Sequence, residues 1–368
     1  MPQLRWQRRR HDEQELSHKK ESTVLRRKLR LQSGLIGLLI ACACVAILWR
    51  QVDLKQSWNA LGRLNGPFLL VPLSVFLVNL PLRAWRWQLI FPPSSRPGFA
   101  SCLTVLGIGN MANFLLPGRA GDLSRCVLVG RAGSLTESSR ALATLAVEKV
   151  LDGLALVGMV LFAAWALHPP HWVIQLLRVA SLIFAGALIL LLMIRYRTRT
   201  LIDVVRSSFR RVHLSSLEGK FDHGLTSFAD GLTAISSVGQ MLWLLALTAA
   251  IWMTELVLIW GLAAVLGTTI TLKSAAVASA VLGLGLMIPA APGGLGTYEL
   301  FGTEAFKLVG LAASSALALT VVIHAWVFVA NVSLGACLLA LKGLSLTRLS
   351  HQLRSGVADG QSEIHTSA

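Results

Sequence analysis

The chain alternates long apolar stretches with short charged ones. Eight stretches are rich in Leu, Val, Ala and Ile, and they cover residues 33–49, 66–82, 100–116, 141–167, 172–194, 239–266, 273–291 and 312–341. A helix needs about 20 apolar residues to cross the hydrocarbon core of a bilayer. The pattern therefore predicts an all-α integral membrane protein in which most of these stretches are transmembrane helices.

Positive charge between the stretches gives them a direction. Residues 1–32 carry ten Lys or Arg against four acids, and residues 195–238 carry seven Lys or Arg, so we expect both segments in the cytoplasm. A full crossing at 100–116 would place the arginines that follow, up to Arg140, on the outside. We therefore expect 100–116 to be a re-entrant segment that enters and leaves from the cytoplasm. The same counting makes 273–291 re-entrant from the outside.

This topology divides the chain into two related halves. We expect a first membrane repeat at 33–167 and a second at 172–342, the second including the cytoplasmic loop 195–238. Each half has three full spans and one re-entrant hairpin, which makes six full spans and two re-entrant segments. Because each half crosses an odd number of times, the second repeat is inverted relative to the first. Residues 343–368 form a polar tail that is predicted to be disordered, and both termini are expected in the cytoplasm.

A repeated glycine-proline motif marks the two re-entrant segments. The first copy reads Gly107-x-Gly109-x-Met111 and continues to Pro117-Gly118-x-x-Gly121; the second reads Gly283-x-Gly285-x-Met287 and continues to Pro292-Gly293-Gly294-x-Gly296. The Pro-Gly step falls at Pro117 in one half and at Pro292 in the other. Matching interruptions in two halves indicate broken helices and a substrate site near the bilayer midplane. Because such backbone is tolerated only inside protein or beside a wet cavity, the motif predicts a polar cavity shared by the halves.

Ionisable residues inside the apolar stretches are the candidate substrate-binding groups. Glu148 and Asp152 are four residues apart on one helical face, and Glu255 lies near the middle of its span. The alternative is that the first two acids are hydrated or bridged near the end of their helix and that Glu255 is a neutral carboxyl bonded to a neighbouring helix. Arg119 and Arg125 flank the first break and are candidates for binding a lipid phosphate. The expected substrate-binding residues are Asn113, Arg119, Asp122, Arg125, Glu148, Asp152, Glu255 and Glu299.

Charge and motifs argue against several other functions. The net charge is +16, but the Lys and Arg lie in tails and loops without an aromatic-basic module, which favours contact of the basic arm with anionic lipid over nucleic acid binding. Five cysteines without zinc spacing predict no metal site. No phosphate-binding loop for ATP is found, and we expect no cofactor. His324, a single histidine in an apolar stretch, is interpreted as a packing residue.

Four ordered motifs resemble a known family. They are Arg83-Ala-Trp-Arg86-Trp87, the segment from Asn113 to Arg125 with its Pro-Gly-Arg-Ala-Gly-Asp core, Glu148-Lys-x-x-Asp152, and Pro289-x-x-Pro-Gly-Gly-Leu-Gly-Thr-Tyr-Glu299. Over about residues 30–342, the chain resembles the transmembrane region of lysylphosphatidylglycerol synthase and its stand-alone, flippase-like relatives. The resemblance implies movement of lipid between leaflets, because aminoacyl transfer in that family belongs to a separate soluble domain. Since only the short tail 343–368 follows the last span, we expect the transport half alone and no enzymatic activity.

Together these features predict a lipid flippase- or scramblase-like transporter in the plasma membrane of a prokaryote. Its substrate would be a phospholipid or another polar lipid that moves through the cavity between the halves. Two alternatives stay open. One is a membrane-embedded transferase on a lipid-linked substrate, with Asp122 or Glu148 as general base. The other is a non-transporting membrane partner of a separate lipid-modifying enzyme, and a homo-oligomer is compatible with each reading.

Overall fold

The computed structural model describes residues 70–116, 120–129, 135–167, 171–211, 218–232, 237–286 and 291–341. Several predictions lie outside the described residues: the basic arm 1–32, the span 33–49, the tail 343–368, and Pro117, Gly118 and Arg119 of the first break. The part of the chain that is described contains helices and no strand, so the prediction of an all-α protein is confirmed.

Most of the described helices coincide with apolar stretches, and four lie between them. They are α3 (Leu70–Ile90), α4 (Phe99–Leu115), α5 (Ala120–Val129), α6 (Leu135–Leu167), α7 (His171–Tyr196), α8 (Thr198–Arg211), α9 (Glu218–Gly231), α10 (Val238–Val265), α11 (Leu272–Gly285), α12 (Thr297–Leu308) and α13 (Ala313–Leu341). Short 3-10 turns at Pro93–Ser95 and Pro292–Gly294 precede α4 and α12. The predicted loop 195–238 contains α8 and α9 and is therefore partly helical.

Three of the described helices are long and apolar enough to cross a membrane. They comprise Val173–Tyr196 of α7, all of α10 and all of α13. Large apolar side chains on α7 such as Leu182 and Ile183 are exposed, as expected of a surface that faces lipid. The chain is therefore a membrane protein. α4 and α11 are apolar but have only 17 and 14 residues, which is too short for a full crossing.

Two helices extend beyond the apolar stretches that predicted them. The stretch 66–82 ends before Arg83, but α3 continues through Arg83 and Arg86 to Ile90. Similarly, α6 begins at Leu135, ahead of the apolar stretch 141–167. In α3 the physical reason is that both guanidinium groups bind carboxylates inside the protein, as described below, so that a helix with charged side chains remains buried.

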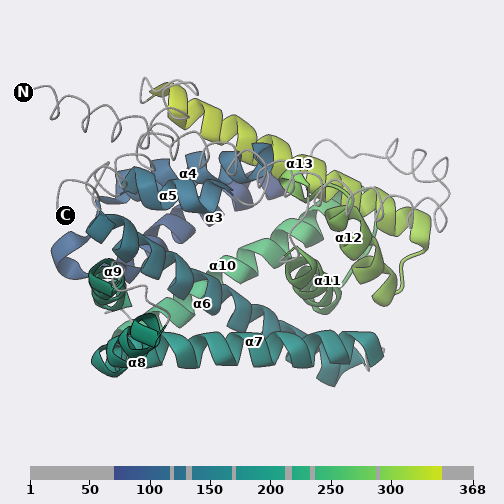
Figure 1. Cartoon of the computed structure of the whole chain (residues 1–368). Coiled ribbons are helices and arrows are strands. Elements are labelled where there is room, and N and C mark those ends of the chain that lie inside the picture. The colour runs from purple at the N-terminus through teal and green to yellow at the C-terminus, as the bar shows by residue number, and fades with distance from the viewer. Residues whose placement is uncertain are drawn as a thin grey trace, which may run out of the picture.

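Helices from the two parts of the chain pack in matching pairs. α3 lies against α10, α4 packs along α5, and α11 packs along α12. In addition, α4 contacts α13, whereas α11 contacts α6. The hairpin of α4 and α5 and the hairpin of α11 and α12 lie toward opposite ends of the molecule (Figure 1). The Pro292–Gly294 turn contacts α4, near Phe114, so the second break reaches the end of the first hairpin's leading helix.

Glycines of the repeated motif allow close packing within both hairpins. A Cβ atom on Gly109 would overlap the side chain of Arg125, and a Cβ atom on Gly285 would overlap Phe301. At Gly121 a Cβ atom would overlap the carbonyl oxygen of Gly109, across the interface of α4 and α5. The hairpins therefore depend on the absence of side chains at these positions, since interiors are close-packed.

We expect Gly121→Ala to destabilise the protein, because the added methyl group would meet a backbone oxygen that cannot rotate away. Overpacking of this kind costs about 1–3 kcal/mol, so the midpoint of thermal unfolding in detergent should fall by several degrees. Gly186 on α7 is the matched control, since a Cβ atom there meets nothing within 4 Å. Gly186→Ala should leave the midpoint unchanged or slightly higher. An unchanged midpoint for Gly121→Ala would contradict the close packing of α4 and α5.

Candidate functional site

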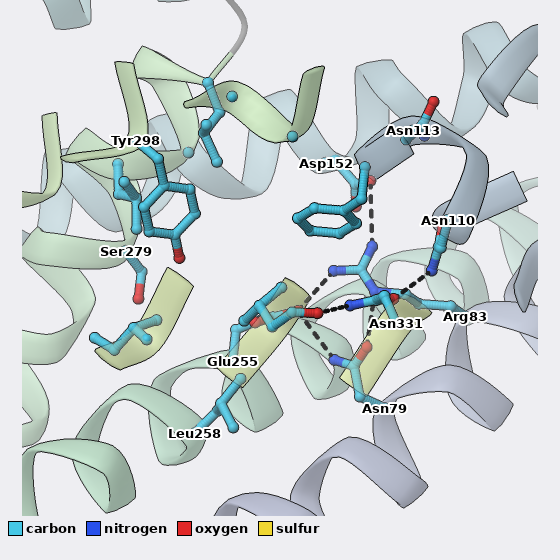
Figure 2. A pocket seen from close by; sticks show the side chains of 18 of the residues that line it. Asn79, Arg83, Asn110, Asn113, Asp152, Glu255, Leu258, Ser279, Tyr298 and Asn331 are labelled. Carbon is cyan, nitrogen blue, oxygen red and sulfur yellow. Dashed lines mark hydrogen bonds and ion pairs between the residues drawn. The ribbon is translucent and has the colours of Figure 1, made fainter. Parts of the chain in front are cut away.

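A cavity of about 450 Å³ lies between the two sets of helices. Its walls come from α3 to α6 on one side and from α10 to α13 on the other. The polar residues that line it are Asn79, Arg83, Asn110, Asn113, Asp122, Arg125, Glu148, Lys149, Asp152, Glu255, Ser279, Thr297, Tyr298 and Asn331. Apolar residues such as Leu156 and Leu258 complete the wall. In Figure 2, Arg83 and Glu255 lie across from Ser279 and Tyr298.

Arg83 on α3 joins opposite sides of this cavity. Its Nη2 donates to Glu255 Oε1 on α10 at 2.9 Å, and its Nη1 lies 3.9 Å from Asp152 Oδ2 on α6. Asn79, one turn earlier, accepts from Arg83 Nε at 2.9 Å and donates to Glu255 Oε1 at 3.3 Å. Figure 2 shows the guanidinium group between the two carboxylates. The side chains of Arg83 and Glu255 are 23% and 27% exposed, so their ion pair is accessible from the cavity.

Arg86, one turn after Arg83, is almost fully buried. Its side chain is 1% exposed, and Nη1 donates to Asp152 Oδ1 at 2.7 Å and to Thr248 Oγ1 at 3.0 Å. A buried ion costs several kcal/mol in lost hydration unless a partner of opposite charge compensates. Asp152 is that partner and also lies near Arg83. These contacts hold α3, α6 and α10 in one arrangement.

A second cluster surrounds Arg125 on α5. Its Nη2 donates to Glu148 Oε1 at 3.1 Å and to Asp122 Oδ1 at 3.3 Å, and its side chain is 2% exposed. Lys149 Nζ lies 3.0 Å from Asp122 Oδ2. Asn113 on α4 donates to Asp122 Oδ1 at 3.0 Å and accepts from the Asp122 backbone N–H at 3.0 Å. Contacts from three helices, α4 to α6, thus converge on one carboxylate.

The charges in these two clusters balance. Among the described residues, four carboxylates face four cations: Asp122, Glu148, Asp152 and Glu255 against Arg83, Arg86, Arg125 and Lys149. A single charge at the bilayer centre costs roughly 2.5–3.5 kcal/mol on insertion scales. Pairing offsets that cost, and it presents both signs of charge to a polar group that enters the cavity. Arg83 and Lys149 can bind a phosphate, whereas Glu255 can bind a cationic group.

The second hairpin holds a smaller polar cluster at its break. His324 on α13 lies 2.5 Å from Glu299 Oε1 through Nδ1 and 2.9 Å from the Gly293 carbonyl oxygen through Nε2. Glu299 Oε2 accepts from the Gly296 backbone N–H at 2.7 Å. The ring of Tyr298 stacks on the imidazole at 4.1 Å. Gly293 and Gly296 have φ angles of 67° and 84°, in the region that favours glycine.

The structure brings most of the expected substrate-binding residues together. Six of the eight line the cavity: Asn113, Asp122, Arg125, Glu148, Asp152 and Glu255. Glu148 and Asp152 share a helical face but bind different arginines, and Glu255 binds Arg83 as well as Asn79. Glu299 lies at the second break, bound to His324, and does not line the cavity. Arg119 lies outside the described residues.

The apolar pattern does not identify Asn79, Arg83, Arg86 or His324 as parts of the site. It places Arg83 and Arg86 at the membrane boundary, because they follow an apolar stretch. Arg83 and Arg86 lie one and two helical turns after Asn79, which puts all three on one helical face. This periodicity is the sequence feature from which their place in the site could have been predicted. His324 is buried, as expected of a packing residue, but its two ring nitrogens also bind Glu299 and Gly293.

Comparison with known protein families identifies the family of this chain. The family described as the lysylphosphatidylglycerol synthase transmembrane region matches residues 34–335. The chain belongs to this family. The matched range contains every residue of the two charged clusters and both breaks, so the resemblance seen in the motifs is confirmed.

A curated relative of this family member is the glycosyltransferase AglD of Haloferax volcanii. The two are 25% identical over 333 residues, which is 82% of this chain and 53% of the relative. The chain thus spans about half the length of that relative. No solved structure matches the chain. The family and the relative support a membrane function related to lipid.

Arg125 and Glu148 of this family member should depend on each other for stability. Arg125→Met and Glu148→Leu should each cost about 3–5 kcal/mol of folding free energy, because each leaves a buried charge without its main partner. The double variant should lie much closer to wild type than the sum, which a double-mutant cycle of thermal unfolding in detergent will measure. The control is the Glu304–Lys307 pair, 29% and 34% exposed, whose loss should cost about 0.2–1 kcal/mol. Additive effects at Arg125 and Glu148 would contradict the buried pair.

Proposed function

We propose that this protein is a lipid flippase- or scramblase-like transporter that moves a polar, phosphate-bearing lipid between leaflets through the cavity between its two halves. The observation that carries the proposal is the Arg83–Glu255 ion pair, which joins the two sides of the cavity and is partly exposed within it. A headgroup phosphate can replace Glu255 at Arg83, and a cationic headgroup can replace Arg83 at Glu255. Exchanging one charged contact for another makes binding strong enough for entry and weak enough for release.

We infer that the six-span inverted repeat expected from charge is the architecture of the transporter. Asn79 donates to Thr254 Oγ1 at 2.7 Å, and the offset between these two residues equals the offset between Pro117 and Pro292 of the two Pro-Gly steps. A residue that touches its own counterpart lies beside the two-fold axis that relates two repeats. The same axis would exchange the contact of α4 and α13 with the contact of α11 and α6.

The glycines of the motif support the same relation. Gly109 packs against Arg125, and Gly285 packs against Phe301, so both members of the contact shift along the chain by 176 residues, one more than the 175 residues between the two Pro-Gly steps. The two hairpins lie toward opposite ends of the molecule (Figure 1), which fits an axis in the plane of the membrane. In this arrangement the first hairpin opens to the cytoplasm and the second to the outside, with both termini cytoplasmic in a prokaryotic plasma membrane.

One observation favours the transferase alternative. The relative AglD, about half of which matches this chain, is named a glycosyltransferase. The family is named for lysyl transfer and the relative for glycosyl transfer, so proteins that share this region differ in the group they transfer. We take the shared region to handle the lipid rather than the donor. Asp122 and Glu148, the candidate general bases, are held by Lys149 and Arg125. Such ion pairs favour binding and positioning over proton abstraction.

Corresponding loops of the two halves should lie on opposite sides of the membrane. Ser94, between α3 and α4, and Thr269, between α10 and α11, are exposed and occupy matching positions in the two halves. In a cysteine-free background, Ser94→Cys should react with an impermeant maleimide only from the cytoplasmic side and Thr269→Cys only from the outside. Labelling in oriented vesicles checks this, and reaction of both cysteines from one side would contradict the inverted repeat.

Lipid exchange by the purified protein tests the proposed function. Proteoliposomes contain fluorescent phospholipid in both leaflets, and external dithionite bleaches the inner-leaflet probe only when lipid changes leaflet. Wild-type protein should permit this bleaching. Arg83→Ala and Glu255→Ala should each slow it by about tenfold or more, because loss of a hydrogen bond to a charged group costs about 1.5–3 kcal/mol. Size-exclusion chromatography checks that the variants stay folded.

The matched control is Arg96→Ala, an exposed arginine in the loop before α4, which should exchange lipid at the wild-type rate. Arg83→Lys should be intermediate, since it keeps the charge but loses the forked geometry. Wild-type protein that leaves the inner-leaflet probe intact would overturn the transporter proposal and favour the non-transporting partner. If both alanine variants exchange lipid at the wild-type rate, the Arg83–Glu255 pair does not contact the transported lipid.

A further inference from the structure

The geometry around His324 requires a proton beyond those of a neutral imidazole and a carboxylate. The Gly293 carbonyl oxygen can only accept, so His324 Nε2, 2.9 Å away, must carry a hydrogen. A carboxylate also only accepts, so the 2.5 Å contact between Nδ1 and Glu299 Oε1 needs a second hydrogen. The pair is therefore either imidazolium with carboxylate or imidazole with carboxylic acid. Both forms hold the same extra proton.

Loss of this proton breaks one of the two contacts of His324. A neutral imidazole carries a hydrogen on only one nitrogen. If Nε2 keeps it, the lone pair of Nδ1 faces the carboxylate of Glu299; if Nδ1 takes it, the lone pair of Nε2 faces the carbonyl of Gly293. Either arrangement brings two acceptors together at a side chain that is buried, where unsatisfied polar groups are costly.

The contacts of this pair hold the second break. His324 binds the carbonyl of Gly293, and Glu299 binds the N–H of Gly296, so the two side chains hold the Gly293–Gly296 turn that precedes α12. Gly293, Thr297 and Tyr298 also line the cavity. A turn that is released from α13 therefore changes the cavity wall.

The other titratable groups near the Glu299–His324 pair are paired with other side chains or lie in apolar surroundings. Tyr298 stacks on the imidazole, and α4 places the uncharged ring of Phe114 near it. On α10, Glu255 is bound to Arg83. The other titratable or charged side chains on described elements packed against α13 are Glu304 and Lys307, paired with each other on α12, and Cys102 in an apolar cluster of α4.

The first half has a permanent ion pair at the corresponding place. An offset of 176 residues relates Gly109 to Gly285, Arg125 to Phe301 and Glu148 to His324, one residue more than the offset between the two Pro-Gly steps, and Glu148 binds Arg125. A guanidinium group keeps its proton in proteins, so the cation of that pair is fixed. The second half thus carries a pair whose cation is a histidine, whereas the cation of the first half's pair is a fixed arginine.

We propose that the Glu299–His324 pair is a proton-binding latch. With its proton the pair holds the second break closed, and without it the break is released and the cavity wall moves. The latch itself follows from the geometry, and its use in transport rests on the proposed function. In the proposed transporter, loss of the proton from the latch would open the lipid path, and binding of the proton would close it.

The latch is tested first without lipid transport. In cysteine-free protein in detergent, Thr297→Cys at a buried position of the break reports opening by its rate of maleimide labelling, and exposed Thr269→Cys gives the rate of the thiol chemistry at each pH. As pH rises from about 5 to 9, the range around histidine titration, the ratio of the two rates should increase in one step. The increase should be about tenfold, as expected for loss of one hydrogen bond to a charged group. A ratio that does not change with pH would overturn the latch.

Two variants separate the latch from a purely structural role. Glu299→Gln can accept from the Gly296 N–H and donate its amide to Nδ1 of a neutral His324, so every contact is kept without the extra proton. We expect its break to stay closed at every pH. His324→Phe loses both contacts and should label at the fast rate throughout. His171→Gln, at an exposed histidine of α7, should keep the wild-type step. A wild-type step in Glu299→Gln would overturn the proposal.

The same variants in the lipid-exchange assay separate this proposal from the proposed function. Wild-type protein should exchange lipid faster as pH rises, and Glu299→Gln should stay slow. Lipid exchange without any pH dependence overturns the coupling and leaves the transporter in place. A pH step in labelling combined with no lipid exchange in wild type supports the latch and overturns the transporter.

Discussion

Arginine side chains buried among apolar helices constrain this structure more than any other feature. Arg86 and Arg125 are 1% and 2% exposed, and a guanidinium group cannot become neutral to escape the cost of burial. Each therefore requires a carboxylate at hydrogen-bond distance, which Asp152 and Glu148 of α6 provide. Lipid is as apolar as a leucine side chain, so apolar contact alone specifies helix packing weakly in a membrane. The ion pairs set how α3 and α5 lie against α6.

The cations of this network differ in how exposed they are. Arg86 and Arg125 are enclosed by their partners and hold helices together. Arg83 and Lys149 have similar partners but keep 23% and 37% of their side chains exposed. Because an accessible ion pair can exchange its partner for an incoming group, whereas an enclosed one cannot, Arg83 and Lys149 are the cations that the proposed transporter would offer to a lipid headgroup.

The two halves share backbone geometry but differ in chemistry. The packing of Gly109 against Arg125 repeats as the packing of Gly285 against Phe301, so the close helix approach is common to both hairpins while the contacting side chain is not. The charged network thus gathers around the first hairpin, and the second has the Glu299–His324 contact instead. In the proposed inverted repeat, the two hairpins are therefore held by different electrostatic contacts.

The sequence by itself determined the helical membrane class, the two glycine-proline breaks, the family, and the shared face of Glu148 and Asp152. These features depend on local properties: apolar transfer, backbone hydrogen bonding within a helix, and the conformations open to glycine and proline. The tertiary structure alone decided that Arg83 meets Glu255 from a distant part of the chain, that α3 continues through its arginines, and that His324 reaches the Gly293 carbonyl. The partner of a charged side chain depends on the register and crossing of two packed helices, and neither is encoded in the periodicity of one helix.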